Sequence, residues 1–138
     1  MPVTHLRVSG STAKIRRFLR VTKLAPCYVY WKGEPRNPGS KVINKSSGFN
    51  VLLSDYDGKS FRTRVRLVSK FLSDHRHELE ALKAMKFRSP MIDFGLYDNT
   101  PSDRMWPMYR IPASFIQLLT EFGFELELSF YGQREDEI

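Results

Sequence analysis

A chain of 138 residues, 41% of them hydrophobic and 13% aromatic, can build one domain with its own core, which argues against intrinsic disorder. No stretch approaches 18 consecutive apolar residues, the first residues lack the apolar segment of a secretory signal, and the single cysteine cannot form an intramolecular disulfide. We therefore expect no membrane span but a cytoplasmic domain over residues 1–132 with a flexible acidic tail over 133–138, and the net charge of +7 favours anionic partners.

The first predicted elements are a short strand and a short basic helix. Apolar and polar residues alternate over Leu6–Val8, as in a strand. Ser9–Thr12 offers a turn and a helix cap, and a helix with one apolar face is predicted over Ala13–Arg20. Pro26 ends this region because proline cannot continue a helix.

Two further strands follow, separated by a loop. Cys27–Trp31 is rich in strand-favouring residues, and Gly48–Leu53 is a second strand candidate. The stretch between them begins with residues 32–39, which the glycines, prolines and asparagine mark as a loop. Asp55–Lys59 is predicted to form a turn after the second strand.

A longer helical region comes next. Apolar residues keep near-helical spacing over Val65–Met85, and Ser73–Asp74 either kinks this region or caps a second helix. Ser89–Pro90 ends it. Alternation over Met91–Tyr97 predicts another strand, and residues 98–103 read as a loop.

The C-terminal part gives the clearest pattern. Pro112 suits the first turn of a helix, and Gly123 suits the position just after its end. The apolar residues between them are spaced i, i+3, i+4 and i+7: Phe115, Leu118, Leu119 and Phe122. Strict alternation over Phe124–Phe130 then predicts a half-buried strand, with Glu125 and Glu127 on its solvated face.

The predicted elements follow the order β-α-β-β-α-β, then α-β. The first six match the order of a ferredoxin-like sandwich, and the last two would extend it. We therefore expect an α+β fold with a single, mostly antiparallel sheet and helices on one face.

Three segments in this order resemble a known bacterial family. They are Trp31-Lys32-Gly33-Glu34-Pro35, then Ser47-Gly48-Phe49 at the head of a strand, then the terminal proline–helix–glycine–strand unit. The chain resembles the family catalogued as domain of unknown function 4279 over roughly Thr4 to Tyr131. The resemblance implies a small α+β domain of bacterial origin and supplies no catalytic residues. An accessory or immunity-type role follows only by analogy with other small single-domain proteins.

Residues able to carry catalysis or bind a metal are few and scattered. His75 and His77 stand two apart on a predicted helix and so point in different directions, and no CxxC or HxxxH spacing occurs. No histidine is placed near Cys27, and Asp55 and Asp57 suit a turn. We therefore predict no enzyme activity, no cofactor and no metal. An enzyme would require His75 or Cys27 to meet a carboxylate inside a pocket.

Charge is split unevenly along the chain, which raises the prospect of nucleic-acid binding. Residues 1–66 hold 14 Lys/Arg and 3 Asp/Glu, a balance of +11, whereas residues 67–138 hold 8 and 12, a balance of −4. Cations neutralise phosphates and aromatic rings stack on unpaired bases. The candidate basic patch is Lys14, Arg16, Arg17, Arg20 and Tyr30, with a further basic group at Arg62, Arg64 and Arg66.

Large aromatic residues beside proline and arginine favour a protein-binding module instead, because Trp, Tyr and Arg are the usual anchors of protein interfaces. The candidate contact residues are Trp31, Lys32, Glu34, Arg36 and Trp106. A basic front half would suit an acidic protein partner, and a second copy of the chain is a further candidate through an open sheet edge. We predict a small non-enzymatic domain that binds another protein, with nucleic-acid binding as the alternative.

Overall fold

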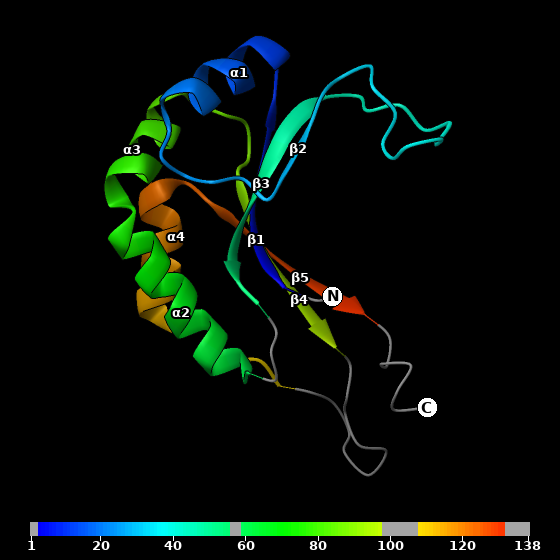
Figure 1. The fold of residues 1–138 in the computed structure, drawn as a ribbon. Helices are drawn as coiled ribbons and strands as arrows, with labels where there is room; N and C mark the ends of the chain where they lie inside the picture. Colours follow the sequence, from blue (N-terminus) through cyan, green and yellow to red (C-terminus); the bar gives the residue numbers. More distant parts are fainter. Residues whose placement is uncertain (1–2, 56–58, 98–107, 132–138) are drawn as a thin grey trace.

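The computed structural model describes residues 3–55, 59–97 and 108–131. These residues form one sheet of strands β1 (Thr4–Gly10), β2 (Tyr28–Tyr30), β3 (Ser47–Ser54), β4 (Met91–Tyr97) and β5 (Glu125–Tyr131). They also form helices α1 (Thr12–Val21), α2 (Phe61–Asp74), α3 (Arg76–Ala84) and α4 (Ala113–Phe122). The helices lie together on one side of the sheet (Figure 1). The predicted tail over 133–138 and Trp106 lie outside the described residues.

The strands lie side by side in the order β2-β3-β1-β4-β5. β3 pairs antiparallel with β2 and β1, and β1 pairs antiparallel with β4. β5 runs parallel to β4, which requires a long crossover connection, and α4 stands in that connection. The prediction of an α+β fold with one mostly antiparallel sheet is thus confirmed. The finer comparison with a ferredoxin-like order stays a prediction.

Alternate residues of the central strands point under the helices and build one half of the core. The buried strand residues include Leu6, Val8, Phe49, Val51, Ile92, Phe94 and Leu96. The helices supply the other half through Ile15, Phe18, Val65, Val68, Leu72, Phe115, Leu119 and Phe122. Phe18 of α1 stacks on Phe49 of β3 with ring centroids 5.5 Å apart. Each side chain buried in this way contributes about 1.5–3 kcal/mol.

The helix ends follow the chemistry of the sequence. Ser11 and Ser60 cap α1 and α2, because each hydroxyl accepts a hydrogen bond from the amide three residues on, at 3.3 and 3.2 Å. The predicted interruption of the long helical region falls at His75, which ends α2 and precedes α3. Gly123 closes α4 with a left-handed φ of 73°.

Candidate functional site

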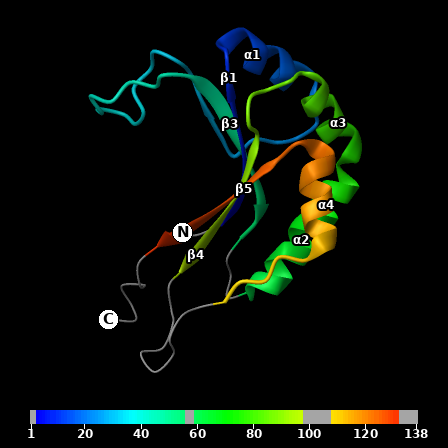
Figure 2. The same cartoon turned by 180° about the vertical axis from the view of Figure 1, so that it is seen from behind.

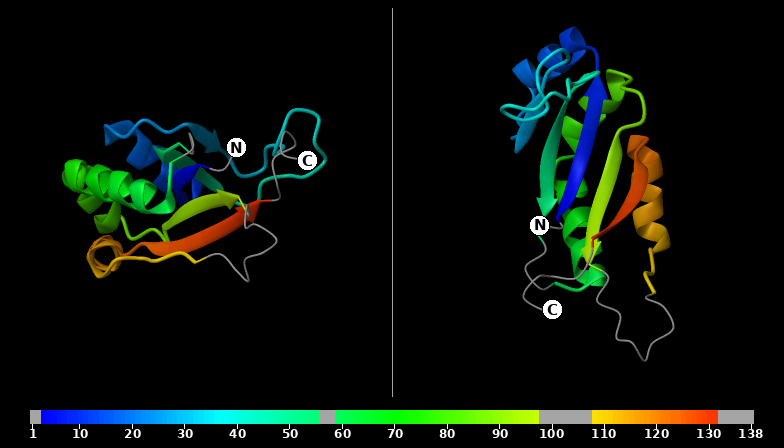
Figure 3. Two further views of the ribbon diagram at one scale, coloured as in Figure 1. Left: turned by 90° about the horizontal axis from the view of Figure 1, so that it is seen from below. Right: turned by 90° about the vertical axis from the view of Figure 1, so that its right-hand side faces the viewer.

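One face of the sheet carries no helix in the described part of the chain, and we call it the open face. The right-hand view of Figure 3 looks onto it, with the helices behind. The strand registers place these residues there: Tyr28, Tyr30, Gly48, Asn50, Leu52, His5, Arg7, Met91, Asp93, Glu125 and Glu127. These positions alternate with the core residues, because successive side chains of a strand point to opposite faces.

A long hairpin-like connection between β2 and β3, residues 32–46, stands out from the sheet; we call it the arm. Figures 1 and 2 show the arm projecting away from α2, α3 and α4. Its two limbs are joined by backbone hydrogen bonds from Arg36 to Val42 at 2.8 Å and from Asn44 to Glu34 at 2.9 Å.

The tip of the arm is a β-turn that its sequence dictates. The Ser40 amide donates to the Asn37 carbonyl at 2.9 Å, with Pro38 and Gly39 between them and a φ of 78° at Gly39. Proline followed by glycine is the pattern of a type II turn, because proline fixes the first central φ and glycine accepts the positive one. The loop predicted over residues 32–39 is therefore the first limb and the turn of an ordered hairpin.

The arm and the open face together line a cavity of ≈ 660 Å³ that is open to solvent. Its lining includes Arg7, Tyr28, Tyr30, Arg36, Lys45 and Glu127. The Tyr28 hydroxyl donates to the Arg36 carbonyl at 3.3 Å and so ties the sheet to the arm. A volume of this size is typical of sites that hold a small molecule or a few side chains of a partner.

Two tyrosines form the wall of this cavity on the β2 side. The rings of Tyr28 and Tyr30 stack with centroids 5.7 Å apart. Tyr30 lies directly over Gly48 of β3, where the missing side chain leaves room for its phenol. Burial raises the pKa of Tyr30, and a hydrogen bond to the Ser46 side chain opposes this shift. Its hydroxyl therefore stays protonated at neutral pH.

An ion pair between an exposed arginine and a buried aspartate lies on the open face. Arg7 of β1 donates to the Asp93 carboxylate of β4 at 2.8 Å, and the Ser129 hydroxyl of β5 donates to the same carboxylate at 2.7 Å. Asp93 is only 3% exposed, so these partners supply the hydrogen bonds that a buried carboxylate needs. The arrangement ties β1, β4 and β5 together below the cavity.

His5 stands beside this ion pair, directly across from Asp93. Burial and the neighbouring Arg7 charge lower the pKa of His5, while Asp93 opposes the shift. The folded protein therefore binds fewer protons here than the unfolded chain at pH values just below 6.5. Stability should fall as the pH drops from 7.5 to 5.5, and His5→Gln should lose less stability over that range.

Urea denaturation at both pH values measures this effect. His77→Gln, at an exposed position of α3, is the matched control and should keep the wild-type pH dependence. Equal losses of unfolding free energy in the His5 variant and the wild type would contradict the assignment.

The two signs of charge lie on different sides of the open face. The arm carries Arg36, Lys41 and Lys45, and none of these forms an ion pair with a described residue. The opposite edge strand, β5, presents Glu125 and Glu127, which are both exposed, as predicted for its solvated face. The site is therefore dipolar, with a basic side at the arm and an acidic side at β5.

The residues predicted to contact a protein partner are only partly brought together. Lys32, Glu34 and Arg36 all lie exposed on the arm, and Arg36 lines the cavity. Trp31 points to the helix side instead, where it packs against the core and the Arg16 guanidinium lies 5.2 Å from its ring centre. Trp31 is thus half-buried at the base of the arm.

The predicted basic patch is divided between two faces. Arg17 and Arg20 are exposed on α1, on the helix side of the sheet, whereas Tyr30 lies on the open face. Lys14 of the same helix donates to the Lys86 carbonyl at 3.0 Å. In the further basic group, Arg62 and Arg66 are exposed, but Arg64 is buried in the core at 1% exposure. The cations of the front half do not form one continuous surface with Tyr30.

Candidate residues for chemistry come together at one place in the described residues, because His75 lines a second cavity with Asp55 and Asp74. No group of three His, Cys, Asp or Glu side chains among the described residues could hold a metal ion. Cys27 is exposed, and its thiol donates to the Asn50 carbonyl at 3.4 Å. His75 stacks on Phe71 with ring centres 4.0 Å apart.

Sequence reasoning missed Arg7 and Asn50 as parts of the site. They are distant in sequence and meet only because β1 lies next to β3 and the arm folds over both. The alternation of Tyr28 and Tyr30 was a usable signal, since residues two apart on a strand share a face.

The fold and the site define the class of protein: a small α+β domain with one open sheet face and a basic arm over it. The chain belongs to the family described as domain of unknown function (DUF4279), whose model matches residues 3–133. This confirms the resemblance. No curated protein and no solved structure matches significantly. Among the described residues, no helix is long and apolar enough to cross a membrane.

Proposed function

We propose that this chain is a non-enzymatic, cytoplasmic bacterial domain that binds another protein through the open face and the arm. The dipolar cavity between them carries the proposal. Tyr28 and Arg36 offer an aromatic ring and a guanidinium, which are common anchors of protein interfaces. Across the cavity, Glu127 adds a negative charge.

The acidic side favours a protein over a nucleic acid. A phosphate backbone would be attracted to the arm but repelled by Glu125 and Glu127 on the same face. A polypeptide carries both signs and can place an acidic residue at the arm and a basic residue at β5. Charge complementarity of this kind sets the register and the specificity of protein interfaces.

Site-specific photo-crosslinking in cells tests this proposal. A photoreactive phenylalanine analogue replaces Tyr28, which is 43% exposed on the open face. The matched control places the same analogue at Ile116, which is 51% exposed on α4. We expect a discrete protein adduct from position 28 and none from position 116. Equal labelling at both positions, or no adduct at position 28, would rule the open face out as the binding surface.

Nucleic-acid binding is the second candidate, and one observation favours it. Arg17 and Arg20 are exposed on α1 and form no ion pair with a described residue. A gel-shift titration with single-stranded RNA and DNA at several salt concentrations measures it. Affinity that falls steeply with salt and is lost on reversing Arg17 and Arg20 to glutamate would support this candidate. Absence of any shift near physiological salt would exclude it.

A further inference from the structure

We infer that a second copy of this chain docks on the open face, so that the basic arm of each protomer lies against the acidic β5 of its partner. The inference rests on the proposed function, because it names the protein that the open face binds. It draws on three features of the described residues: the arrangement of charge, the position of the arm and the apolar side chains on the arm and the face.

The charge arrangement is self-complementary. The arm contributes Lys32, Arg36, Lys41 and Lys45 against a single acidic residue, Glu34, so its balance is +3. β5 contributes Glu125 and Glu127 and no basic residue. Since β2 and β5 are the two edges of the sheet, the two signs lie at opposite sides of one face. One chain therefore carries both halves of an electrostatic contact.

In a two-fold symmetric dimer, the contact between the basic arm and the acidic β5 would form twice. If two open faces meet around an axis that runs parallel to the strands, the β2 edge of one protomer faces the β5 edge of the other. Each arm then meets the partner's β5, and the same contact occurs on both sides of the axis. Such an isologous interface is the commonest form of homodimer. An axis across the strands would instead bring the two basic arms together.

The position and composition of the arm fit this contact. The arm projects on the side away from α2, α3 and α4, so it extends from the face that would be covered (Figures 1 and 2). Val42 and Ile43 on the arm are 52% and 47% exposed, and Leu52 on the open face is 44% exposed. When a partner covers exposed aliphatic side chains, the free energy of the complex falls.

Sedimentation equilibrium over a range of protein concentrations tests the inference. Two charge-reversed variants are compared with the wild type: an arm variant, Arg36→Glu/Lys41→Glu/Lys45→Glu, and an edge variant, Glu125→Lys/Glu127→Lys. All five positions are exposed, so both variants should fold. The wild type should dimerise, and each variant alone should dissociate at least tenfold more readily, because like charges then meet at both contacts.

An equimolar mixture of the two variants provides the decisive result. In the mixed dimer, one contact joins the acidic arm of the arm variant to the basic edge of the edge variant. The other contact joins an unchanged basic arm to an unchanged acidic β5. Both contacts are attractive, so the mixture should regain the dimer. A control variant, Arg17→Glu/Arg20→Glu/Arg66→Glu on the helix side, has the same change in net charge as the arm variant. It should still dimerise, because its substitutions lie outside the open face. Circular dichroism confirms that each variant is folded.

Three outcomes would overturn the inference: a monomeric wild type at every concentration, variants that dimerise like the wild type, or a mixture that stays monomeric. These outcomes leave the proposed function open, because an adduct at position 28 with a different protein would still support it. An adduct with the mass of two copies of this chain would support both.

Discussion

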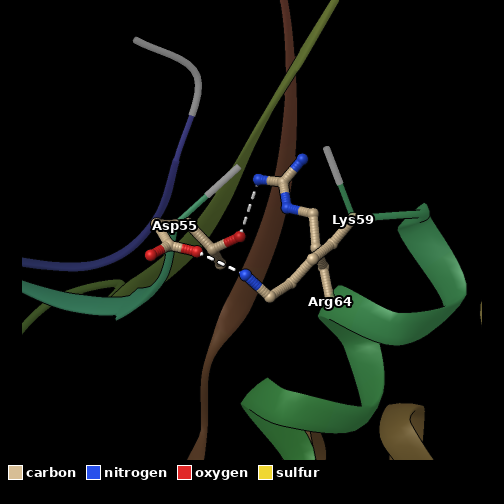
Figure 4. Close-up of polar contacts among 4 residues, drawn as sticks. Asp55, Lys59 and Arg64 are labelled. Atoms are coloured by element: carbon tan, nitrogen blue, oxygen red, sulfur yellow. Dashed lines mark hydrogen bonds and ion pairs between the residues drawn. The ribbon is translucent and has the colours of Figure 1, made fainter. Parts of the chain in front are cut away.

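Replacing Arg64 by alanine should lower the free energy of unfolding by about 3–5 kcal/mol, because removing one partner strands buried polar groups and leaves a cavity. Arg64 extends from the first turn of α2 into the core (Figure 4). Its guanidinium donates to the Gly95 carbonyl at 2.7 Å and to the Thr4 hydroxyl at 2.9 Å. It also lies 5.7 Å from the centre of the Phe94 ring. The alanine variant loses all three contacts.

Urea denaturation of the variant and of a matched control measures this effect. Arg66→Ala, at an exposed position two residues along the same helix, should change the unfolding free energy by no more than about 0.5 kcal/mol. Lysine at position 64 should recover only part of the loss, because one ammonium cannot reproduce the two-pronged geometry of a guanidinium. Equal stability of the two alanine variants would show that Arg64 does not brace α2 against β1 and β4.

The burial of Arg64 could have been noticed in the sequence. Phe61, Arg64, Val65, Val68 and Leu72 stand at helical spacing, so Arg64 falls on the apolar side of α2. Grouping it with Arg62 and Arg66 as a solvated cation ignored that spacing. What the sequence could not supply is the acceptor, since Gly95 is 31 residues away and faces Arg64 only once β4 is in place.

Local patterns predicted the elements well where one signal dominated. The strand Met91–Tyr97 has the predicted bounds, and α4 ends where Gly123 takes a positive φ. β1 is longer than predicted, because its ends are stabilised by pairing with β3 and β4 rather than by their own apolar residues. β2 is shorter than predicted, since only Tyr28–Tyr30 pairs with β3.

The candidate site was harder to predict because it depends on which face the helices cover. Alternation in the sequence separates Tyr28 and Tyr30 from Trp31, but it does not say which set stays uncovered. The helices pack over the face of the sheet that carries Phe49. The tyrosines therefore face the cavity, and Trp31 packs against the hydrophobic core. Part of the charge split along the chain likewise becomes a split across one face, because the arm and β5 lie at opposite edges, while Arg17 and Arg20 stay on the helix side.

Placing a side chain at Gly48 should lower the free energy of unfolding by about 1–3 kcal/mol, the usual cost of overpacking. A Cβ there would lie 2.5 Å from the Val8 carbonyl oxygen, and it would also collide with the Tyr30 hydroxyl. Backbone cannot yield as a flexible side chain does, so Gly48→Ala should cost more than Gly10→Ala, whose new Cβ would meet only the Phe87 ring, at 3.0 Å. Urea denaturation of both variants gives the comparison.

The Tyr30→Ala background separates the two collisions at Gly48. Without the phenol, Gly48→Ala should cost less than in the wild type but should remain destabilising, because the contact with the Val8 carbonyl persists. Gly48→Ala should also displace Tyr30 from the cavity wall and so weaken the crosslink from position 28. A Gly48→Ala variant as stable as the wild type, with an undiminished crosslink, would mean that the close approach of Tyr30 to β3 does not shape the open face.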